Sequence, residues 1–361
     1  MEKLKVLIAD TYVTDRRLIA EAVGRTSLGT VVHTAPNSSI ALEWLQQCPM
    51  DVILLGASMA GQDMLIKAKA AQPDIEVIII SDGNPRSAGA TIRALEQGAF
   101  DFVLKVFGQD AEKTVEAVRS QLDVLFAQIK VKKYSRPDAC GSPEAACEKA
   151  CLKFPAARGR AGAQAVRFGK PELVLFASST GGPAALEAVF RQLPGSFPAP
   201  VLVVQHMPAE FTAAFAQSLD KVSEMEIVEA RDGSPLKAGR AVIAAGGQHM
   251  KVSRPGGKDA VITLDRSPYV NGVRPAADVL FKSAAEAYEG RSVLAVIFTG
   301  MGNDGTCGVS ELKSRCGCYC ITQSESTSVV YGMPRCAREA GLSDETADIG
   351  DMAGRIYRLS L

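Results

Sequence analysis

The segment Val174-Leu-Phe-Ala-Ser-Ser-Thr-Gly-Gly-Pro183 has the pattern of a strand, a tight turn and the start of a helix. The glycines permit a sharp turn, and Pro183 suits the first turn of a helix. Ser179 in this turn would lie near free backbone N–H groups, where negative charge is stabilised. Ser179 is therefore a candidate nucleophile, although an N-cap serine or a bound phosphate would suit the same pattern. The segment matches neither G-x-S-x-G nor the P-loop.

A nucleophilic serine needs a base, and the chain has three histidines. His206 directly follows the apolar run Val201–Gln205, so it would lie at the carboxyl end of a strand, beside Ser179 if the two strands are neighbours. His249 follows a glycine turn and could occupy a similar rim, whereas His33 lies in the other half of the chain. His206 is the favoured base, with a purely structural histidine as the alternative.

Asp304 lies in a glycine-rich turn that follows an apolar run. It could orient the base and stabilise its charged form, which would complete a Ser-His-Asp triad. The same turn, Gly300-x-Gly302-x-x-Gly305, also matches the dinucleotide-binding fingerprint, and Glu325 lies where a ribose-binding acid would fall. The fingerprint comes late in its domain, however, and a nucleotide site gives the serine and the histidine no role. The triad is favoured, and the nucleotide site stays open as the alternative.

The chain has 361 residues, with 40 basic and 40 acidic side chains, which predicts two domains and excludes bulk electrostatic attraction to nucleic acid or membrane. No apolar run approaches the roughly 18 residues of a membrane span, and the first one, which ends at Asp10, is too short for a signal peptide. Nine cysteines, an odd number, favour a reducing compartment. We expect a cytoplasmic protein with buried or incidental thiols and no membrane insertion.

The first 125 residues alternate apolar runs with helical patterns, which predicts a doubly wound parallel sheet. The runs are Val6–Ala9, Val52–Leu55, Val77–Ile80 and Phe102–Leu104. Ligands of such sheets bind at the carboxyl ends of the strands. The candidate positions there are Asp10, Gly56, Ser81 and Lys105.

The strand-and-helix pattern dissolves between about residues 129 and 170. This stretch has ten basic and three acidic residues, a surplus of seven positive charges. A solvated linker is favoured, and a docking segment for an acidic partner is the alternative. We therefore predict domains at 1–125 and 169–361, joined by a basic linker at 126–168.

The alternation returns after Pro171 and predicts a second α/β domain with a mostly parallel sheet and one antiparallel hairpin. The hairpin would pair Met250–Ser253 with Val261–Leu264. The other runs are Leu173–Ala177, Val201–Gln205, Ala241–Ala245, Val293–Thr299 and Tyr319–Thr322.

Five ordered blocks resemble the signature blocks of the chemotaxis protein-glutamate methylesterases. They are Ala177–Gly182, Val204–Pro208, Arg274–Phe281, Thr299–Gly305 and Ser328–Arg335. The resemblance covers nearly the whole chain, because that family carries a receiver domain, a linker and a catalytic domain in this order. It implies a flavodoxin-like receiver with a five-stranded parallel sheet, followed by a doubly wound α/β methylesterase domain.

Carried over by position, Ser179 matches the nucleophile of that family, His206 the general base and Asp304 the orienting carboxylate. Thr180 and Met301 match neighbours that support the histidine and the oxyanion. The resemblance implies hydrolysis of glutamate γ-methyl esters and deamidation of glutamines on chemoreceptor helices, without metal or cofactor. A chemotaxis histidine kinase is a further expected partner, and nucleic acid is not one. A binding module that docks on receptors or kinases without turnover is the alternative.

The first domain departs from a working receiver, which needs an acceptor aspartate after its third strand and two acids after its first to hold Mg²⁺. Gly56 stands at the acceptor position, and the first-strand pair is Asp10-Thr11, so one carboxylate of three remains. Ser81 and Lys105 keep the hydroxyl and lysine positions, with Val106 in place of the proline that usually follows. We predict a pseudo-receiver without aspartyl phosphorylation, and Asp63 in the following loop or helix is not expected to replace the acceptor.

Overall fold

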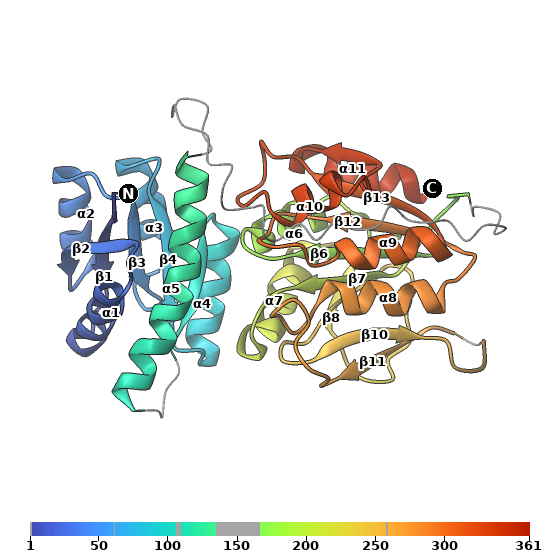
Figure 1. Ribbon diagram of the computed structural model, residues 1–361, viewed down its shortest axis with the longest axis horizontal. Helices are drawn as coiled ribbons and strands as arrows, with labels where there is room; N and C mark the ends of the chain where they lie inside the picture. The colour runs from blue at the N-terminus through green and yellow to red at the C-terminus, as the bar shows by residue number, and fades with distance from the viewer. Residues whose placement is uncertain (1, 61, 106–109, 135–166, 258) are drawn as a thin grey trace. The chain divides into compact units, whose positions relative to one another are not determined.

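The computed structural model describes residues 2–60, 62–105, 110–134, 167–257 and 259–361. The chain divides into two compact units, Met1–Pro143 and Glu144–Leu361 (Figure 1). No helix in the described ranges is long and apolar enough to cross a membrane.

The first unit has a five-stranded parallel sheet in the order β2-β1-β3-β4-β5. Its strands are β1 (Leu4–Ala9), β2 (Gly29–Ala35), β3 (Val52–Gly56), β4 (Glu76–Ser81) and β5 (Asp101–Leu104). Its helices are α1 (Val13–Arg25), α2 (Ser38–Gln47), α3 (Gln62–Ala71), α4 (Pro85–Glu96) and α5 (Ala111–Tyr134). This strand order is the flavodoxin-like one, which confirms the fold expected for this half.

Strand β2 is the element of this sheet that the apolar runs do not reveal. It lies at the edge and pairs with β1, so its buried and more exposed residues alternate instead of forming a continuous apolar run. In contrast, all residues of the central strands β3 and β4 are buried. Burial on both faces is what makes those two strands visible in the sequence.

Helix α5 continues past residue 125, where the sequence predicted the first domain to end. Three lysines that we counted in the linker-like stretch, Lys130, Lys132 and Lys133, therefore belong to this helix, and the last two pair with acids of the first unit. Lys132 Nζ lies 2.7 Å from Glu76 Oε1, and Lys133 pairs with Asp51. Most of the predicted linker lies outside the described residues.

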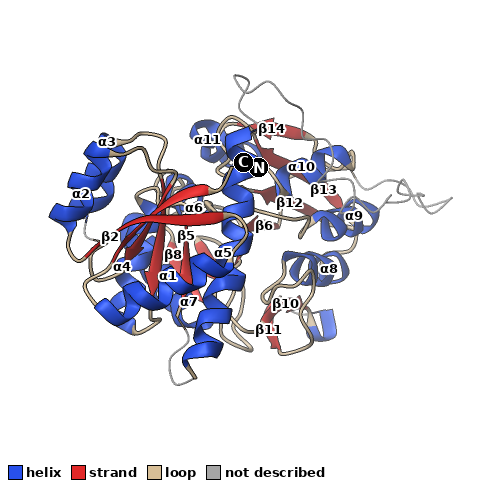
Figure 2. Cartoon of the chain, turned by 60° about the vertical axis from the view of Figure 1, so that its left-hand side comes forward, coloured by secondary structure: helices blue, strands red, loops and turns tan. Residues whose placement is uncertain are grey.

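The second unit has a seven-stranded parallel sheet in the order β14-β13-β12-β6-β7-β9-β8. These strands are β6 (Leu173–Ser178), β7 (Val201–Gln205), β8 (Glu226–Glu229), β9 (Arg240–Ile243), β12 (Ser292–Ile297), β13 (Gly317–Gln323) and β14 (Glu345–Ala347). An antiparallel hairpin, β10 (His249–Ser253) with β11 (Val261–Asp265), packs beside helix α8 (Figure 2). The predicted hairpin is thereby confirmed.

Helices cover both faces of this sheet. They are α6 (Gly182–Phe190), α7 (Ala209–Val222), α8 (Ala277–Ala287), α9 (Thr306–Arg315), α10 (Met333–Glu339) and α11 (Ile349–Ser360), with a short 3₁₀ turn at Pro255–Gly257. Along β6, Leu173 and Leu175 join the core built with α8 and α9, while Phe176 faces the other way, with its ring 5.8 Å from that of Phe190 on α6. Burial on alternate faces of one strand is the mark of a doubly wound sheet.

Candidate active site

The three predicted triad residues follow three neighbouring strands. Ser179 comes directly after β6, His206 directly after β7, and Asp304 lies in the turn between β12 and α9. Strand β6 lies between β12 and β7. From β6 the chain adds strands first on the β7 side of the sheet and then on the β12 side, so β6 lies where the strand order reverses. Ligands of open α/β sheets bind at such a point, outside the carboxyl ends of the strands.

Backbone hydrogen bonds fix the three strand ends against one another. The amide of His206 donates to the carbonyl of Ser178 at 3.0 Å, and the amide of Ser179 donates to the carbonyl of Thr299 at 3.0 Å. The parallel ladder thus continues to the last residue before the site on both sides of β6. The candidate nucleophile is held by the rigid sheet, although it stands in a turn.

Nε2 of His206 lies 2.8 Å from Oδ2 of Asp304, and both side chains are largely buried. An ionised carboxylate can only accept a hydrogen bond, so Nε2 carries the proton. In the neutral ring Nδ1 is then the unprotonated nitrogen, able to accept a proton from a nucleophile. Within the described residues, no hydrogen bond joins the Ser179 hydroxyl to this ring.

The Asp304 carboxylate is held on both of its oxygens. Oδ2 also accepts the Ala277 amide at 2.6 Å, and Oδ1 accepts the Asp278 amide at 3.1 Å. These are the first two N–H groups of α8, so the carboxylate lies at the positive end of that helix. Burial alone would raise the pKa of Asp304, but hydrogen bonds from His206 and from the two amides lower it below its ordinary value of 3.8. Asp304 is therefore ionised at neutral pH.

The turn that carries Asp304 packs directly on the candidate nucleophile. A Cβ at Gly300 would lie 2.7 Å from the Ser179 Cβ and 2.5 Å from the Met333 Sδ, so glycine is required there. Met301, the next residue, is 48% exposed. Thr180 is buried, and its carbonyl accepts the Thr299 hydroxyl at 2.9 Å. Thr180 thus directly follows the serine, and Met301 directly follows the glycine that packs on it.

Gln205 is a site residue that the sequence did not reveal. Its Nε2 donates to the carbonyls of Ser179 at 3.0 Å and of His206 at 3.2 Å, and its Oε1 accepts the Ser178 hydroxyl at 2.7 Å. One buried amide therefore ties the serine turn to the histidine turn. The signal in the sequence that could have revealed Gln205 is its place as a polar residue at the end of an otherwise apolar strand.

The packing disfavours the dinucleotide alternative. In that site a pyrophosphate would lie against the backbone of the glycine turn. Here the Gly300 carbonyl instead accepts the amides of Gly332 at 3.1 Å and Met333 at 2.8 Å. A Cβ at Gly332 would lie 2.6 Å from that carbonyl oxygen and 3.1 Å from the Gly302 nitrogen. Protein backbone occupies one side of the turn, and its glycines serve close packing.

His249, the other candidate base, is fully buried away from the serine turn. Its Nε2 lies 3.0 Å from the Pro268 carbonyl, and its Nδ1 accepts the Ala276 amide at 3.2 Å. Nε2 must therefore donate, which makes the ring neutral. It ties the loop before α8 to the hairpin. His33 in the first unit stacks on Trp44, with ring centroids 3.6 Å apart.

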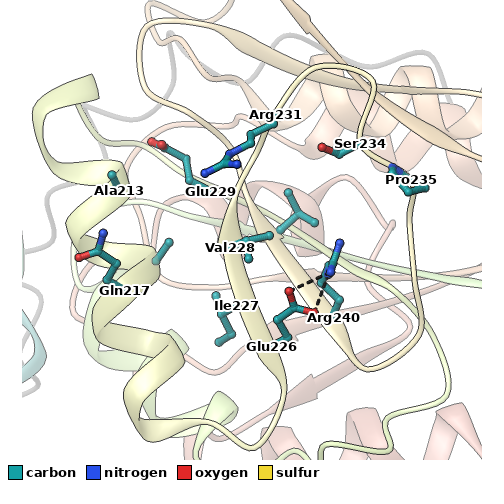
Figure 3. A pocket seen from close by; sticks show the side chains of 12 residues that line it. Ala213, Gln217, Glu226, Ile227, Val228, Glu229, Arg231, Ser234, Pro235 and Arg240 are labelled. Carbon is teal, nitrogen blue, oxygen red and sulfur yellow. Dashed lines mark hydrogen bonds and ion pairs between the residues drawn. The ribbon is translucent and has the colours of Figure 1, made fainter.

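A cavity of about 410 Å³ lies elsewhere in the second unit, between α7 and the edge strand β8 (Figure 3). Its twelve lining residues include Glu226 and Arg240, which form an ion pair at 2.8 Å, and none of the triad. Strand β8 is three positions along the sheet from β6. We therefore assign this cavity no part in the chemistry of the triad.

The receiver positions of the first unit are filled by contacts within the chain. A Cβ at Gly56 would overlap Oδ2 of Asp10, so this carboxylate lies in the space beside the missing acceptor. Lys105 forms an ion pair with Asp15 of α1. Burial raises the pKa of Asp10, which the Tyr12 amide at 2.9 Å partly offsets.

The remaining receiver positions that the structure describes carry polar side chains, but these side chains are not arranged as the ligands of a metal ion. The Thr11 hydroxyl lies 3.0 Å from that of Ser58, and Ser81 Oγ lies 3.3 Å from Ser87 Oγ. Asp63 lies in the first turn of α3 with its side chain 87% exposed. Position 106 lies outside the described residues.

The fold and site define a receiver-like domain and an α/β domain whose candidate serine, histidine and aspartate follow three neighbouring strands, and comparison with known proteins agrees. Residues 6–119 match the response regulator receiver domain, and residues 174–356 match the CheB methylesterase domain. The chain belongs to the CheB methylesterase family.

Individual relatives extend over the whole chain. A protein-glutamate methylesterase/protein-glutamine glutaminase of Symbiobacterium thermophilum is 38% identical, over 98% of this chain and 96% of the relative, and one of Chromohalobacter salexigens is 35% identical, over 99% and 96%. The crystal structure of the Thermotoga maritima CheB methylesterase catalytic domain is 40% identical, with a TM-score of 0.51, and covers 52% of this chain and 98% of that one. The family and enzyme class expected from the sequence are confirmed.

Proposed function

We propose that this chain hydrolyses glutamate γ-methyl esters, and deamidates glutamines, on the cytoplasmic helices of chemoreceptors. The activity names come from its relatives, and the observation in this chain that best supports the proposal is the 2.8 Å hydrogen bond between His206 and Asp304 at the strand end next to Ser179. An ester and a primary amide differ in the leaving group and share the γ-carbonyl, so one acyl-transfer site serves both.

In the proposed mechanism, His206 Nδ1 takes the Ser179 proton as the hydroxyl oxygen attacks the γ-carbonyl carbon. Asp304 stabilises the imidazolium that forms. The imidazolium then gives its proton to the departing methanol or ammonia, which leaves the glutamyl group bound to Ser179. Water hydrolyses this acyl-enzyme by the same proton transfers and restores the serine. No metal or cofactor takes part.

The oxyanion of each tetrahedral intermediate needs backbone donors near the serine. We assign this role first to the N–H of Met301, because the turn at Gly300 packs against Ser179. The N-terminus of α6, which begins at Gly182 just after the serine turn, adds a favourable dipole. Thr180 supports the turn from its buried position.

We further propose that the receiver domain takes no phosphoryl group. Two of the three carboxylates that would hold Mg²⁺ and accept the phosphoryl group are absent from the sequence, and Asp10 packs where the acceptor side chain would stand. The esterase must then be always repressed, always open or controlled by a partner such as a chemotaxis histidine kinase. The division into a first domain, a basic linker and a catalytic domain at 169–361 remains part of this proposal, with the first domain extended to the end of α5 at Tyr134.

The test is methanol release from methylated chemoreceptor membranes, measured for the full chain and for a fragment that begins at Arg167. Similar rates from both would show an open enzyme, and a faster fragment would show repression by the first domain. Receptor binding without methanol release by either protein would overturn the proposal in favour of a docking module.

A further inference from the structure

The helices α8 and α9 pack side by side (Figure 1). Backbone amides at the N-terminus of each helix donate to a carboxylate that lies at the N-terminus of the other. Asp304, just before α9, accepts the Ala277 and Asp278 amides that begin α8. Asp278, in the first turn of α8, accepts the Gly308 amide of α9 at 2.7 Å. Two buried carboxylates therefore lie close together, and each interaction with a helix end stabilises its charge.

One side chain bridges the two carboxylates. The amide nitrogen of Asn271 lies 2.9 Å from Asp304 Oδ1 and 2.9 Å from Asp278 Oδ2. An amide NH₂ has two hydrogens, so it can donate one to each acid. Asn271 lies at the surface in the loop before α8, but its amide is directed inward to these oxygens.

We propose that Asn271 is a positioning residue of the reaction, whose amide fixes the plane of the Asp304 carboxylate and thereby the orientation of the His206 ring. This inference rests on the proposed function and adds a residue to its machinery. Oδ2 is the oxygen that meets Nε2 of His206, while Oδ1 accepts both the Asp278 backbone amide and the Asn271 side-chain amide. Asn271 thus adds a second donor to Oδ1, which further restricts rotation of the carboxylate about its Cβ–Cγ bond.

The loop that presents Asn271 is itself firmly held. His249 binds the Pro268 carbonyl and the Ala276 amide, on either side of Asn271. Arg274 donates to the carbonyls of Arg266 and Ser267, at 3.1 and 3.0 Å, and stacks on a tyrosine ring of the same loop. A side chain on a loop braced at both ends can hold its partner with the precision that proton transfer needs.

The backbone conformation at Asn271 allows the contribution of its side-chain amide to be tested separately from that of the turn. Its φ is +54°, a left-handed conformation that asparagine tolerates and glycine adopts freely. Asn271→Gly therefore keeps the turn and removes only the amide. Asn271→Asp keeps the shape but places a third carboxylate against Asp304 and Asp278. Gly272→Ala is the matched control, because it strains a residue with φ of +76° whose Cβ would touch nothing within 4 Å.

The experiment measures kcat and KM for methyl-ester hydrolysis by the full chain and by these three variants. We expect Asn271→Gly to lower kcat roughly ten- to a hundredfold with little change in KM, the effect of losing one hydrogen bond to a charged group. Asn271→Asp should fall at least as far. Gly272→Ala should lose thermal stability yet keep its kcat. If the turn had only a structural role, straining it in Gly272→Ala would lower kcat as well.

A second readout does not depend on turnover. Nitrogen-15 NMR of the histidine rings reports which ring nitrogen of His206 carries the proton, and in Asn271→Gly the tautomer protonated at Nε2 should be less populated because its carboxylate partner is less well held. The titratable groups next to Asp304 are Asp278, Lys282 and the Cys307 thiol, and all are retained in this variant. Wild-type kcat together with an unchanged His206 tautomer in Asn271→Gly would overturn the inference. An inactive wild-type enzyme would overturn the proposed function instead, and the NMR measurement of the tautomer would still decide the role of Asn271.

Discussion

His206 meets Asp304 through Nε2, at 2.8 Å from Oδ2, so Nδ1 is the ring nitrogen that takes the Ser179 proton in the proposed mechanism. The carboxylate in turn lies on the first two amides of α8. The orienting acid of the triad is thus also part of the packing between two helices, and a change at this one residue affects both catalysis and stability.

Asp304→Asn should lower kcat roughly a thousandfold. The amide NH₂ would replace one carboxylate oxygen and would face N–H groups, so it could not hold His206 in the tautomer that leaves Nδ1 unprotonated. The measurement is methanol release under saturating substrate. Asp123→Asn is the control, since Asp123 pairs with Arg119 on α5 of the first unit. An Asp304→Asn rate within threefold of wild type would contradict the assignment of the orienting residue.

The stability contributed by Asp304 should depend on pH. Its pKa in the folded chain is below the ordinary 3.8 of an unfolded chain, so the ionised form stabilises the folded state. This contribution is fully present above pH 3.8 and is lost as the pH falls through the lower, folded value. Thermal melts of wild type and Asp304→Asn should therefore differ most near neutral pH and converge in acid. A difference in melting temperature that grows toward low pH would contradict a lowered pKa of Asp304 in the folded chain.

Gly300→Ala should reduce activity and stability together. The added Cβ would lie 2.7 Å from the Ser179 Cβ and 2.5 Å from the Met333 Sδ, so the serine turn has to shift. Overpacking of this kind costs roughly 1–3 kcal/mol, and a displaced nucleophile should lower kcat at least tenfold. Gly350→Ala in α11, where a Cβ would touch nothing within 4 Å, is the matched control and should keep full activity.

Acetyl phosphate with Mg²⁺ should leave no stable label on the first domain. Gly56→Asp alone should not create an efficient acceptor, because its side chain would collide with Asp10, and Lys105 is already paired with Asp15. Intact-mass measurement after incubation checks both proteins. A phosphoryl adduct on the wild-type chain that disappears in Asp63→Asn would refute the pseudo-receiver proposal.

The cysteines of β13 and of the end of α9 should be unreactive while the chain is folded. Burial raises the pKa of Cys316 to about 11 and of Cys320 to about 12, and the thiolate is the form that reacts. Iodoacetamide at pH 8, followed by peptide mass spectrometry, should label neither residue until denaturant is added. Rapid labelling of Cys320 in the folded chain would contradict its place in the core.

The central parts of both sheets could be predicted from the sequence because strands buried on both faces form continuous apolar runs. The strands that were missed are edge strands or short ones: β2, β8 (Glu226–Glu229) and β14 (Glu345–Ala347). An edge strand is only partly buried, so charged and polar residues are retained and the run is interrupted. The end of α5 was missed for another reason: Lys132 and Lys133 read as solvated, but they pair with Glu76 of β4 and with Asp51 just before β3.

The positions of the candidate triad could be predicted because each member follows a recognisable strand, and the family resemblance supplied the roles that we propose for them. Gln205 and Asn271 could not, because their roles depend on contacts across long sequence separations. Asn271 lies 33 residues from Asp304 and Gln205 lies 26 from Ser179. The sequence did contain the block Arg274–Phe281 that resembles the family, yet nothing in it indicated that its amides bind the orienting acid.

The measurement that tests the central claim most directly is methanol release from methylated chemoreceptors by the wild-type chain and by Ser179→Ala. The substitution removes one hydroxyl oxygen, so circular dichroism and the melting temperature should stay unchanged and serve as the control for folding. We predict release by the wild-type enzyme and none above background by the variant. Comparable release by a well-folded Ser179→Ala would contradict serine-based acyl transfer at this site.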